Sequence, residues 1–315
     1  MTLGNTKTAR TRLALAAASL GFLLLAAPSA NAFCRTTTCD PNKPKDMCQF
    51  DANKCVVTGK PLSWRSSCVT IGIQEMGSPR NGFTVDDVST VLEQAFGVWT
   101  QADCGNGTPS IEVNFLGSLE CGISEYNSDA ANANIVIFRE DTWPFLGAEN
   151  AIGITTTRFD TKTGDLWDAD MELNAIGAEL SIGDPITGDD LLSVLTHEAG
   201  HFLGLSHSNN GTATMRPVYS PAIDGTDFRS LAQDDIDGIC TVYPPGRKAP
   251  TASCENRHGF SEQCGDDQPA SKESKGCSLN TRTAPLGNGE SGYASLLAVL
   301  AGVVGARLAR RRRIV

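Results

Sequence analysis

Three histidines and a glutamate lie within one short run of this 315-residue sequence, from His197 to His207. Residues four apart on a helix share one face, about one turn from each other, so the imidazoles of His197 and His201 can reach the same ion. With His207 as a third nitrogen ligand, the fourth position of a zinc ion stays open, which is typical of catalytic zinc and not of structural zinc. The spacing therefore predicts one catalytic zinc centre.

Glu198 lies one residue round the helix from the first ligand, where it can reach a zinc-bound water without ligating the metal. We predict that it acts as general base and then as general acid in a hydrolysis. Gly204 is expected to end the helix in the left-handed conformation and to turn the chain so that His207 approaches the ion. The alternative, histidines in a core without metal, would carry a large cost of polar burial.

The run His197-Glu198-Ala199-Gly200-His201, with His207, is similar to the metzincin signature, and Leu203-Gly204-Leu205 resembles its matrixin branch. Ala213 to Tyr219 resembles the Met-turn and the substrate-pocket wall of matrixins, and Leu231 to Tyr243 their last catalytic-domain helix. The resemblance implies a zincin-like fold, peptide-bond hydrolysis in a peptide or protein substrate, Met215 beneath the metal, and Pro217 and Tyr219 beside a substrate pocket.

Hydrophobic periodicity predicts an α+β domain. Alternating or short apolar segments indicate strands, and spacing at i, i+3 and i+4 after Thr84 indicates an amphipathic helix. With the resemblance, this implies a twisted, mixed five-stranded sheet with about three helices, in which the active-site helix precedes the Met-turn. The expected strands cover 69–73, 111–115, 134–138, 152–159 and 166–174, and the expected helices cover 84–99, 187–204 and 231–242.

Asp168, Asp170 and Glu172 alternate along one expected strand, which places their carboxylates on one side. Oxygen ligands on one side could bind calcium, and a solvated strand face is the alternative. In matrixins a similar acidic stretch accompanies calcium. Their structural zinc uses further histidines, and His258 is the one histidine left here, so we expect no second zinc of that kind.

The charge is unevenly distributed. Residues 33–290 carry 18 basic and 36 acidic residues, since eight of the 26 basic residues lie in the two terminal segments. Such an acidic body should repel nucleic acid. All 11 cysteines follow a predicted signal sequence, and exported proteins meet an oxidising environment, so we expect disulfides. An odd number leaves one cysteine over, for which Cys277 is our candidate.

The chain is expected to contain five segments. Basic residues, an apolar run and Ala30-Asn31-Ala32 predict a signal peptide, and the last segment combines a marginal apolar span with an arginine cluster. Gly276-Cys277-Ser278 and that tail resemble the myxobacterial-type C-terminal sorting tail, which implies processing near Cys277 and transient membrane attachment. The segments are 1–32, signal peptide; 33–63, cysteine-rich lead-in stapled to the core; 64–245, catalytic domain; 246–290, polar linker with Cys254 and Cys264; and 291–315, sorting tail.

The sequence favours an exported, extracellular or cell-surface protein that is monomeric. Two alternatives remain: a zinc-stabilised binding or adhesion module without turnover, and an enzyme that acts on a non-protein ester or amide. Latency is also open, because the Pro-Arg-Cys propeptide motif of matrixins is absent. Cys34 or Cys39 could instead reach the zinc, although disulfide pairing competes with that role.

Overall fold

The computed structural model describes Met1 and residues 32–43, 45–262, 291–295 and 313–314. The chain divides into two compact units, Met1–Ala30 and Asn31–Val315, and every described residue except Met1 belongs to the second unit. Most of the predicted signal peptide and Cys277 lie outside the described residues.

A mixed sheet organises the second unit. Its central strands follow the order β6-β7-β5-β3-β4, in which β6 runs antiparallel to β7 and the remaining neighbours run parallel. This confirms the predicted five-stranded mixed sheet. Two further strands, β2 (Ser63–Trp64) and β12 (Ser291–Ser295), pair with β7 and with the outer edge of β6. The central strands are β3 (Cys68–Gln74), β4 (Glu112–Leu119), β5 (Ile135–Phe138), β6 (Gly153–Asp160) and β7 (Asp165–Leu173).

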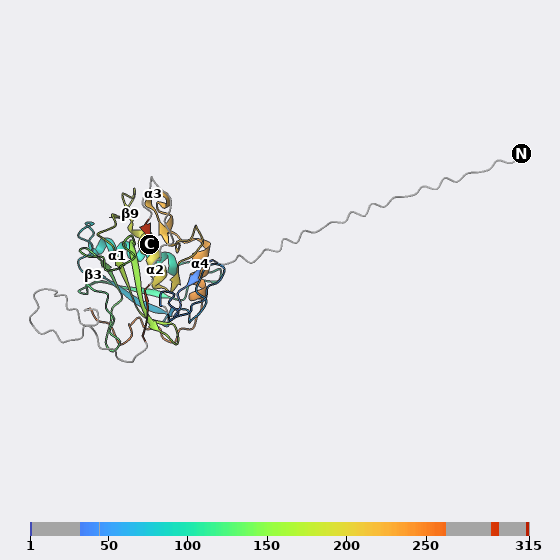
Figure 1. Ribbon diagram of the computed structural model, residues 1–315, viewed down its shortest axis with the longest axis horizontal. Coiled ribbons are helices and arrows are strands. Elements are labelled where there is room, and N and C mark those ends of the chain that lie inside the picture. Colours follow the sequence, from blue (N-terminus) through green and yellow to red (C-terminus); the bar gives the residue numbers. More distant parts are fainter. Residues whose placement is uncertain (2–31, 44, 263–290, 296–312, 315) are drawn as a thin grey trace, which may run out of the picture. The chain divides into compact units, whose positions relative to one another are not determined.

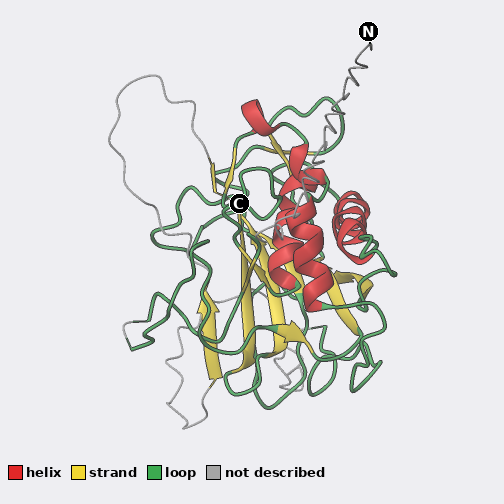
Figure 2. Cartoon of the chain, turned by 90° about the vertical axis from the view of Figure 1, so that its right-hand side faces the viewer, coloured by secondary structure: helices red, strands yellow, loops and turns green. Residues whose placement is uncertain are grey.

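The two longest helices lie together on one face of the sheet (Figure 2). Helix α1 (Val85–Thr100) starts at Thr84, whose hydroxyl accepts a hydrogen bond from the Asp87 amide, so the predicted cap is confirmed. Helix α2 (Leu191–Phe202) is buried along all its residues except Leu192. The remaining helices are α3 (Pro221–Asp224), the 3-10 turn η1 (Asp227–Arg229) and α4 (Gln233–Val242).

Aromatic contacts fix α2 against α1 and the sheet. The Phe202 ring lies 5.1 Å from the Phe96 ring and 5.3 Å from the Trp64 ring. The indole N–H of Trp99 donates to the Thr196 carbonyl, and that of Trp64 donates to the Phe202 carbonyl, both at 2.8 Å. Because both indoles also satisfy backbone groups of α2, its position in the core is closely defined.

The cysteine-rich lead-in differs from the expectation that disulfides staple it to the core. Cys34–Cys55 and Cys39–Cys48 both close within the lead-in itself. It is attached to the core by backbone hydrogen bonds, because β1 (Cys34–Arg35) pairs antiparallel with β10 (Leu205–Ser206). The other short pairs are β8 (Leu180–Ser181) with β9 (Asp189–Asp190), and β11 (Val218–Tyr219) with β13 (Arg313–Ile314). Figure 1 labels β9.

Two disulfides do cross the core. Cys104–Cys240 joins the loop after α1 to α4, and Cys68–Cys254 joins β3 to the predicted linker. The described part of that linker therefore continues along the sheet, where the Thr70 hydroxyl donates to the Asn256 side chain at 2.7 Å. Cys121 is also disulfide-bonded, and Cys264, like Cys277, lies outside the described residues.

The predicted apolar span of the tail is described only in part. In the parts of the chain that the structure covers, no helix has the length and apolar character needed to cross a membrane. Residues 291–295 form the strand β12, and residues 296–312 lie outside the described residues.

The two kinds of disulfide should differ in their contribution to stability. The Cys68–Cys254 disulfide closes a loop between cysteines 186 residues apart in the sequence. Replacing both cysteines by serine should therefore lower the free energy of unfolding by about 2–5 kcal/mol. Replacing Cys39 and Cys48, nine residues apart, should cost less, because a short loop loses less entropy on closure. Denaturant unfolding of both double variants measures the difference, and equal losses would contradict this reading.

Candidate metal centre

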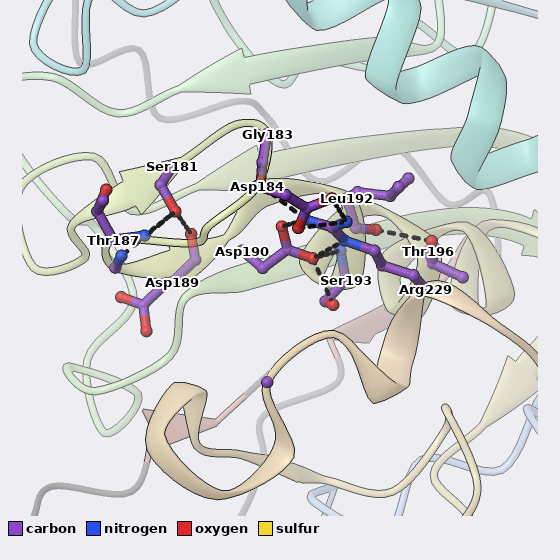
Figure 3. A network of polar contacts seen from close by, with 12 residues as sticks. Ser181, Gly183, Asp184, Thr187, Asp189, Asp190, Leu192, Ser193, Thr196 and Arg229 are labelled. Atoms are coloured by element: carbon purple, nitrogen blue, oxygen red, sulfur yellow. Dashed lines mark hydrogen bonds and ion pairs between the residues drawn. The ribbon is translucent and has the colours of Figure 1, made fainter.

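An ion-pair network holds the start of α2 (Figure 3). Asp190 is the N-cap residue, and its carboxylate accepts hydrogen bonds from the Ser193 amide at 3.0 Å and from the Ser193 hydroxyl at 2.6 Å. Arg229 donates to both oxygens of the same carboxylate, at 2.7 and 2.8 Å, and also reaches Asp184. The bidentate contact links the active-site helix to the segment that follows the Met-turn.

The three predicted ligands converge. The Nε2 atoms of His197 and His201 lie 3.1 Å apart, and candidate ligand atoms of all three histidines lie within 4.8 Å of one another. His197 and His201 are buried, and His207 is half-buried. Among the described residues this is the one group of three or more such side chains close enough to share an ion.

Two backbone carbonyls set the tautomers of these rings. His197 Nδ1 lies 2.6 Å from the Thr214 carbonyl oxygen, and His201 Nδ1 lies 2.9 Å from that of Leu205. A carbonyl only accepts, so each Nδ1 carries the proton and each Nε2 presents a lone pair. Two lone pairs 3.1 Å apart repel each other unless a cation lies between them.

The donor set fits zinc. Nitrogens about 2.0–2.1 Å from a tetrahedral ion are about 3.3 Å apart, close to the observed 3.1 Å. Burial, with the neighbouring His207, lowers the pKa of His201 to about 3, so this imidazole is neutral and can ligate near pH 7. His197, His201 and His207 would therefore hold the ion.

Met215 of the predicted Met-turn packs against the helix between the two ligands. Met215 is buried, and a Cβ added to Gly200 would meet its sulfur at 2.2 Å, so the glycine between the two ligands makes room for this methionine. The Asp235 carboxylate accepts from the backbone amides of Thr214 and Met215, at 2.8 and 3.1 Å. Asp235 thus fixes the turn whose carbonyl orients His197.

The loop that carries His207 has its own anchors. Gly204 adopts φ = 95°, as predicted, and a Cβ there would also meet the Leu62 carbonyl oxygen at 2.7 Å. The Ser208 hydroxyl donates to Asp234 at 2.6 Å, and the other oxygen of that carboxylate accepts from the Ala32 amide at 2.8 Å. Leu62 of the lead-in therefore lies against Gly204, and Ala32, the last residue of the predicted signal peptide, shares the Asp234 carboxylate with Ser208.

Glu198 lies beside the histidines and is 1% exposed. Its Oε2 accepts a hydrogen bond from the Thr155 hydroxyl at 2.5 Å, whereas Oε1 has no hydrogen-bond partner among the described residues. Burial raises the pKa of Glu198 to about 7, and the bond from Thr155 opposes this rise. A carboxylate of this kind can take up and release a proton near neutral pH.

The two predicted pocket residues are placed differently. Pro217 is half-buried, but the Tyr219 side chain is fully buried. The Tyr219 hydroxyl accepts from the Asp190 amide at 3.4 Å and donates to the Gly225 carbonyl at 2.8 Å. Tyr219 therefore supports the wall and the start of α2 from behind, so only its backbone is available to line a pocket.

The predicted calcium ligands are buried on β7, not on a solvated face. Glu172 forms an ion pair with Arg139, and Asp170 accepts from the Ser124 hydroxyl at 2.9 Å and from the Ile135 amide at 3.1 Å. Burial raises the pKa of Asp168 well above its usual range, and the charge of Arg158 opposes this. Arg139 thus compensates Glu172, whereas Asp168 Oδ1 is buried without a hydrogen-bond partner among the described residues, and calcium binding remains a prediction.

Sequence reasoning did not identify Thr155, Asp190, Arg229 or Asp235 as site residues. Asp190 fell within the expected helix 187–204, and Asp235 within the expected helix 231–242. Alternation along β6 could have placed Thr155 on the face toward α2, but its contact with Glu198 depends on the packing of the two elements.

Removing Arg229 should destabilise the protein strongly. Arg229→Ala leaves Asp190, 1% exposed, as a buried charge without its partner, which costs about 3–5 kcal/mol of unfolding free energy. Arg65→Ala is the matched control, because that side chain is 64% exposed and lies 3.8 Å from Asp165, and its loss should cost about 1 kcal/mol or less. Equal losses in denaturant unfolding would refute the anchoring role.

Comparisons with known proteins agree with this geometry. The matrixin family model, Peptidase M10, matches residues 63–244. Stromelysin-1 of Rattus norvegicus is 48% identical over 67 residues, which are 21% of this chain and 14% of that protein. Matrix metalloproteinase-C of Caenorhabditis elegans is 26% identical over 214 residues, 62% of this chain and 32% of that protein. Metalloendoproteinase 1-MMP of Arabidopsis thaliana is 28% identical over 203 residues, 64% of this chain and 50% of that protein.

This chain thus spans half or less of the length of these relatives. The family match covers more than half of the chain and contains all three histidines, Glu198 and the Met-turn, so the protein belongs to the matrixin family.

Proposed function

We propose that the chain is an exported zinc endopeptidase that hydrolyses peptide bonds in peptide or protein substrates. The observation that carries this proposal is the convergence of three imidazoles next to a buried carboxylate, one oxygen of which has no hydrogen-bond partner among the described residues. Three protein ligands leave a zinc ion one open position, as catalytic sites require.

Different residues would bind the metal, transfer the proton and orient the ligands. Zinc, when bound, supplies Lewis acidity to the scissile carbonyl and lowers the pKa of a water molecule. Glu198 Oε1 accepts a proton from the attacking water and later delivers it to the leaving amine, so the carboxylate acts first as base and then as acid. Thr214 and Leu205 keep two imidazoles in the ligating tautomer throughout.

The edge of β6 favours an extended peptide as the substrate. Thr155 of this strand contacts Glu198, so a peptide paired along β6 would pass the reactive carboxylate. The strand accepts antiparallel pairing, since β12 pairs along Thr156 to Asp160. Backbone pairing gives affinity that depends little on sequence, while side-chain pockets supply the preference.

The alternatives are less well supported. A binding module that uses zinc only for stability has no need for a carboxylate with one unpaired oxygen at the metal centre. A non-protein ester or amide could be attacked by the same chemistry, but it would make no use of backbone pairing with β6. A panel of unrelated peptides and small esters separates these substrates.

Export is supported by the disulfides, which form and persist in oxidising compartments. We propose an extracellular or cell-surface location, with the C-terminal tail as the attachment. Cys34 and Cys39 are disulfide-bonded, which argues against either as a zinc-blocking thiolate.

Glu198→Gln should abolish turnover while the zinc ligands stay intact. The amide is nearly isosteric but cannot accept the proton, so kcat should fall by at least about 100-fold, the lower end for loss of general base catalysis. Cleavage of a denatured protein mixture, read by mass spectrometry, measures the loss, and metal analysis verifies that zinc is retained. Unchanged cleavage would disprove the assignment of the base.

Removal of the metal should abolish cleavage and lower the thermal stability. Without a cation the imidazole lone pairs of His197 and His201 repel each other, and a ligand that binds only the folded state stabilises it by mass action. Treatment with a chelator, followed by zinc addition, should stop and then restore cleavage. Activity that persists in the demetallated protein would rule out the zinc mechanism.

A further inference from the structure

The edge strand contributes two residues to the surroundings of Glu198. Gly153 and Thr155 alternate along β6 and therefore face the same side, toward α2. A Cβ added to Gly153 would lie 2.7 Å from Glu198 Oε1 and 3.0 Å from its Cγ and Cδ. The Thr155 hydroxyl lies 2.5 Å from Oε2. One residue leaves space for the carboxylate and the other binds it.

The two carboxylate oxygens are consequently in different environments. Oε2 is held by a hydrogen bond to a charged acceptor, a strong type. Oε1 is buried, without a hydrogen-bond partner among the described residues, and has the space that the missing Cβ of Gly153 leaves. The carboxylate is thus fixed in one rotation about its last bond, with Oε1 as the oxygen available for a proton.

The Thr155 hydroxyl also lies 3.2 Å from the backbone carbonyl oxygen of Glu198. A hydroxyl has one proton to donate, so it donates to Oε2 while the carboxylate is charged. When Glu198 holds a proton during the reaction, the hydroxyl can donate to that carbonyl instead. The same side chain can therefore support both forms of Glu198 in the reaction cycle.

We propose that Thr155 is a positioning residue for the general base, and that Gly153 forms the other side of its slot. The proposal rests on the function proposed above for Glu198. It makes β6 both the strand that pairs with substrate and the strand that orients the base, so the peptide and the carboxylate are aligned by one element.

The test compares Thr155→Val, Thr155→Ser and Glu198→Gln in the zinc-loaded protein with a peptide substrate. Thr155→Val removes the hydroxyl at nearly constant volume and should lower kcat by about 10- to 100-fold, the range for loss of one hydrogen bond to a charged group. KM and zinc content should remain close to those of the parent. Thr155→Ser keeps the hydroxyl and should restore kcat to within a few-fold.

Thr70→Val is the matched control. Thr70 is a buried threonine of β3 whose hydroxyl also makes one side-chain hydrogen bond, to Asn256 at 2.7 Å. A merely structural effect of losing a threonine hydroxyl would appear in this variant as well, whereas we expect a lower melting temperature with kcat unchanged. Gly153→Ala approaches the slot from the Oε1 side and should also lower kcat without changing zinc content, which keeps the proposal testable if Thr155→Val does not fold.

A kcat of Thr155→Val within twofold of the parent, together with an inactive Glu198→Gln, would overturn the positioning role and leave the proposed function intact. An active Glu198→Gln would refute the proposed function itself. Loss of kcat in Thr155→Val that Thr155→Ser does not restore would also overturn the proposal, because the hydroxyl would then not be responsible.

Discussion

The constraint on which the site depends is that two unprotonated imidazole nitrogens must lie close enough together for one cation to bind both. The Nε2 atoms of His197 and His201 are 3.1 Å apart, and the tautomer that directs both lone pairs inward is set by two carbonyls. The residues that hold the Thr214 and Leu205 carbonyls in place are therefore part of the metal centre.

The side chains that hold the metal centre in place come from elements that are distant in the sequence. Asp235 of α4 binds the Met-turn amides, Asp234 binds the loop after His207, and Arg229 holds the start of α2 through Asp190. Each contact is made by a carboxylate that is buried or nearly so, and a buried carboxylate is tolerated only when hydrogen bonds or an arginine compensate it. Some of the chain's many acidic residues are thus buried and stabilise the fold, and do not belong to a solvated surface.

Local features of this architecture could be predicted from the sequence, because local rules decide them. The spacing of His197 and His201, the cap at Thr84 and the left-handed turn at Gly204 each depend on backbone geometry over a few residues. Features that depend on packing between distant segments could not. Helix α4 begins at Gln233 and not at Leu231, since Asp235 reaches back to the Ala232 amide. The Tyr219 ring is fully buried, which the sequence did not indicate.

Strand alternation illustrates the same limit in two places. On β7 it correctly predicted three carboxylates on one side, but Arg139 and Arg158 come from other strands or their ends, so the compensating charges were not visible in the pattern. On β6 alternation gives Gly153 and Thr155 a common face, yet only the packing of β6 against α2 gives that face a role. Because one strand then limits both where a peptide can pair and how Glu198 can turn, a shift of β6 would disturb substrate and base together. Among the described residues β12 pairs with Thr156 to Asp160 and not with Gly153 to Thr155. A substrate strand added beside Gly153 to Thr155 would therefore lie against the part of β6 whose inner face holds the base.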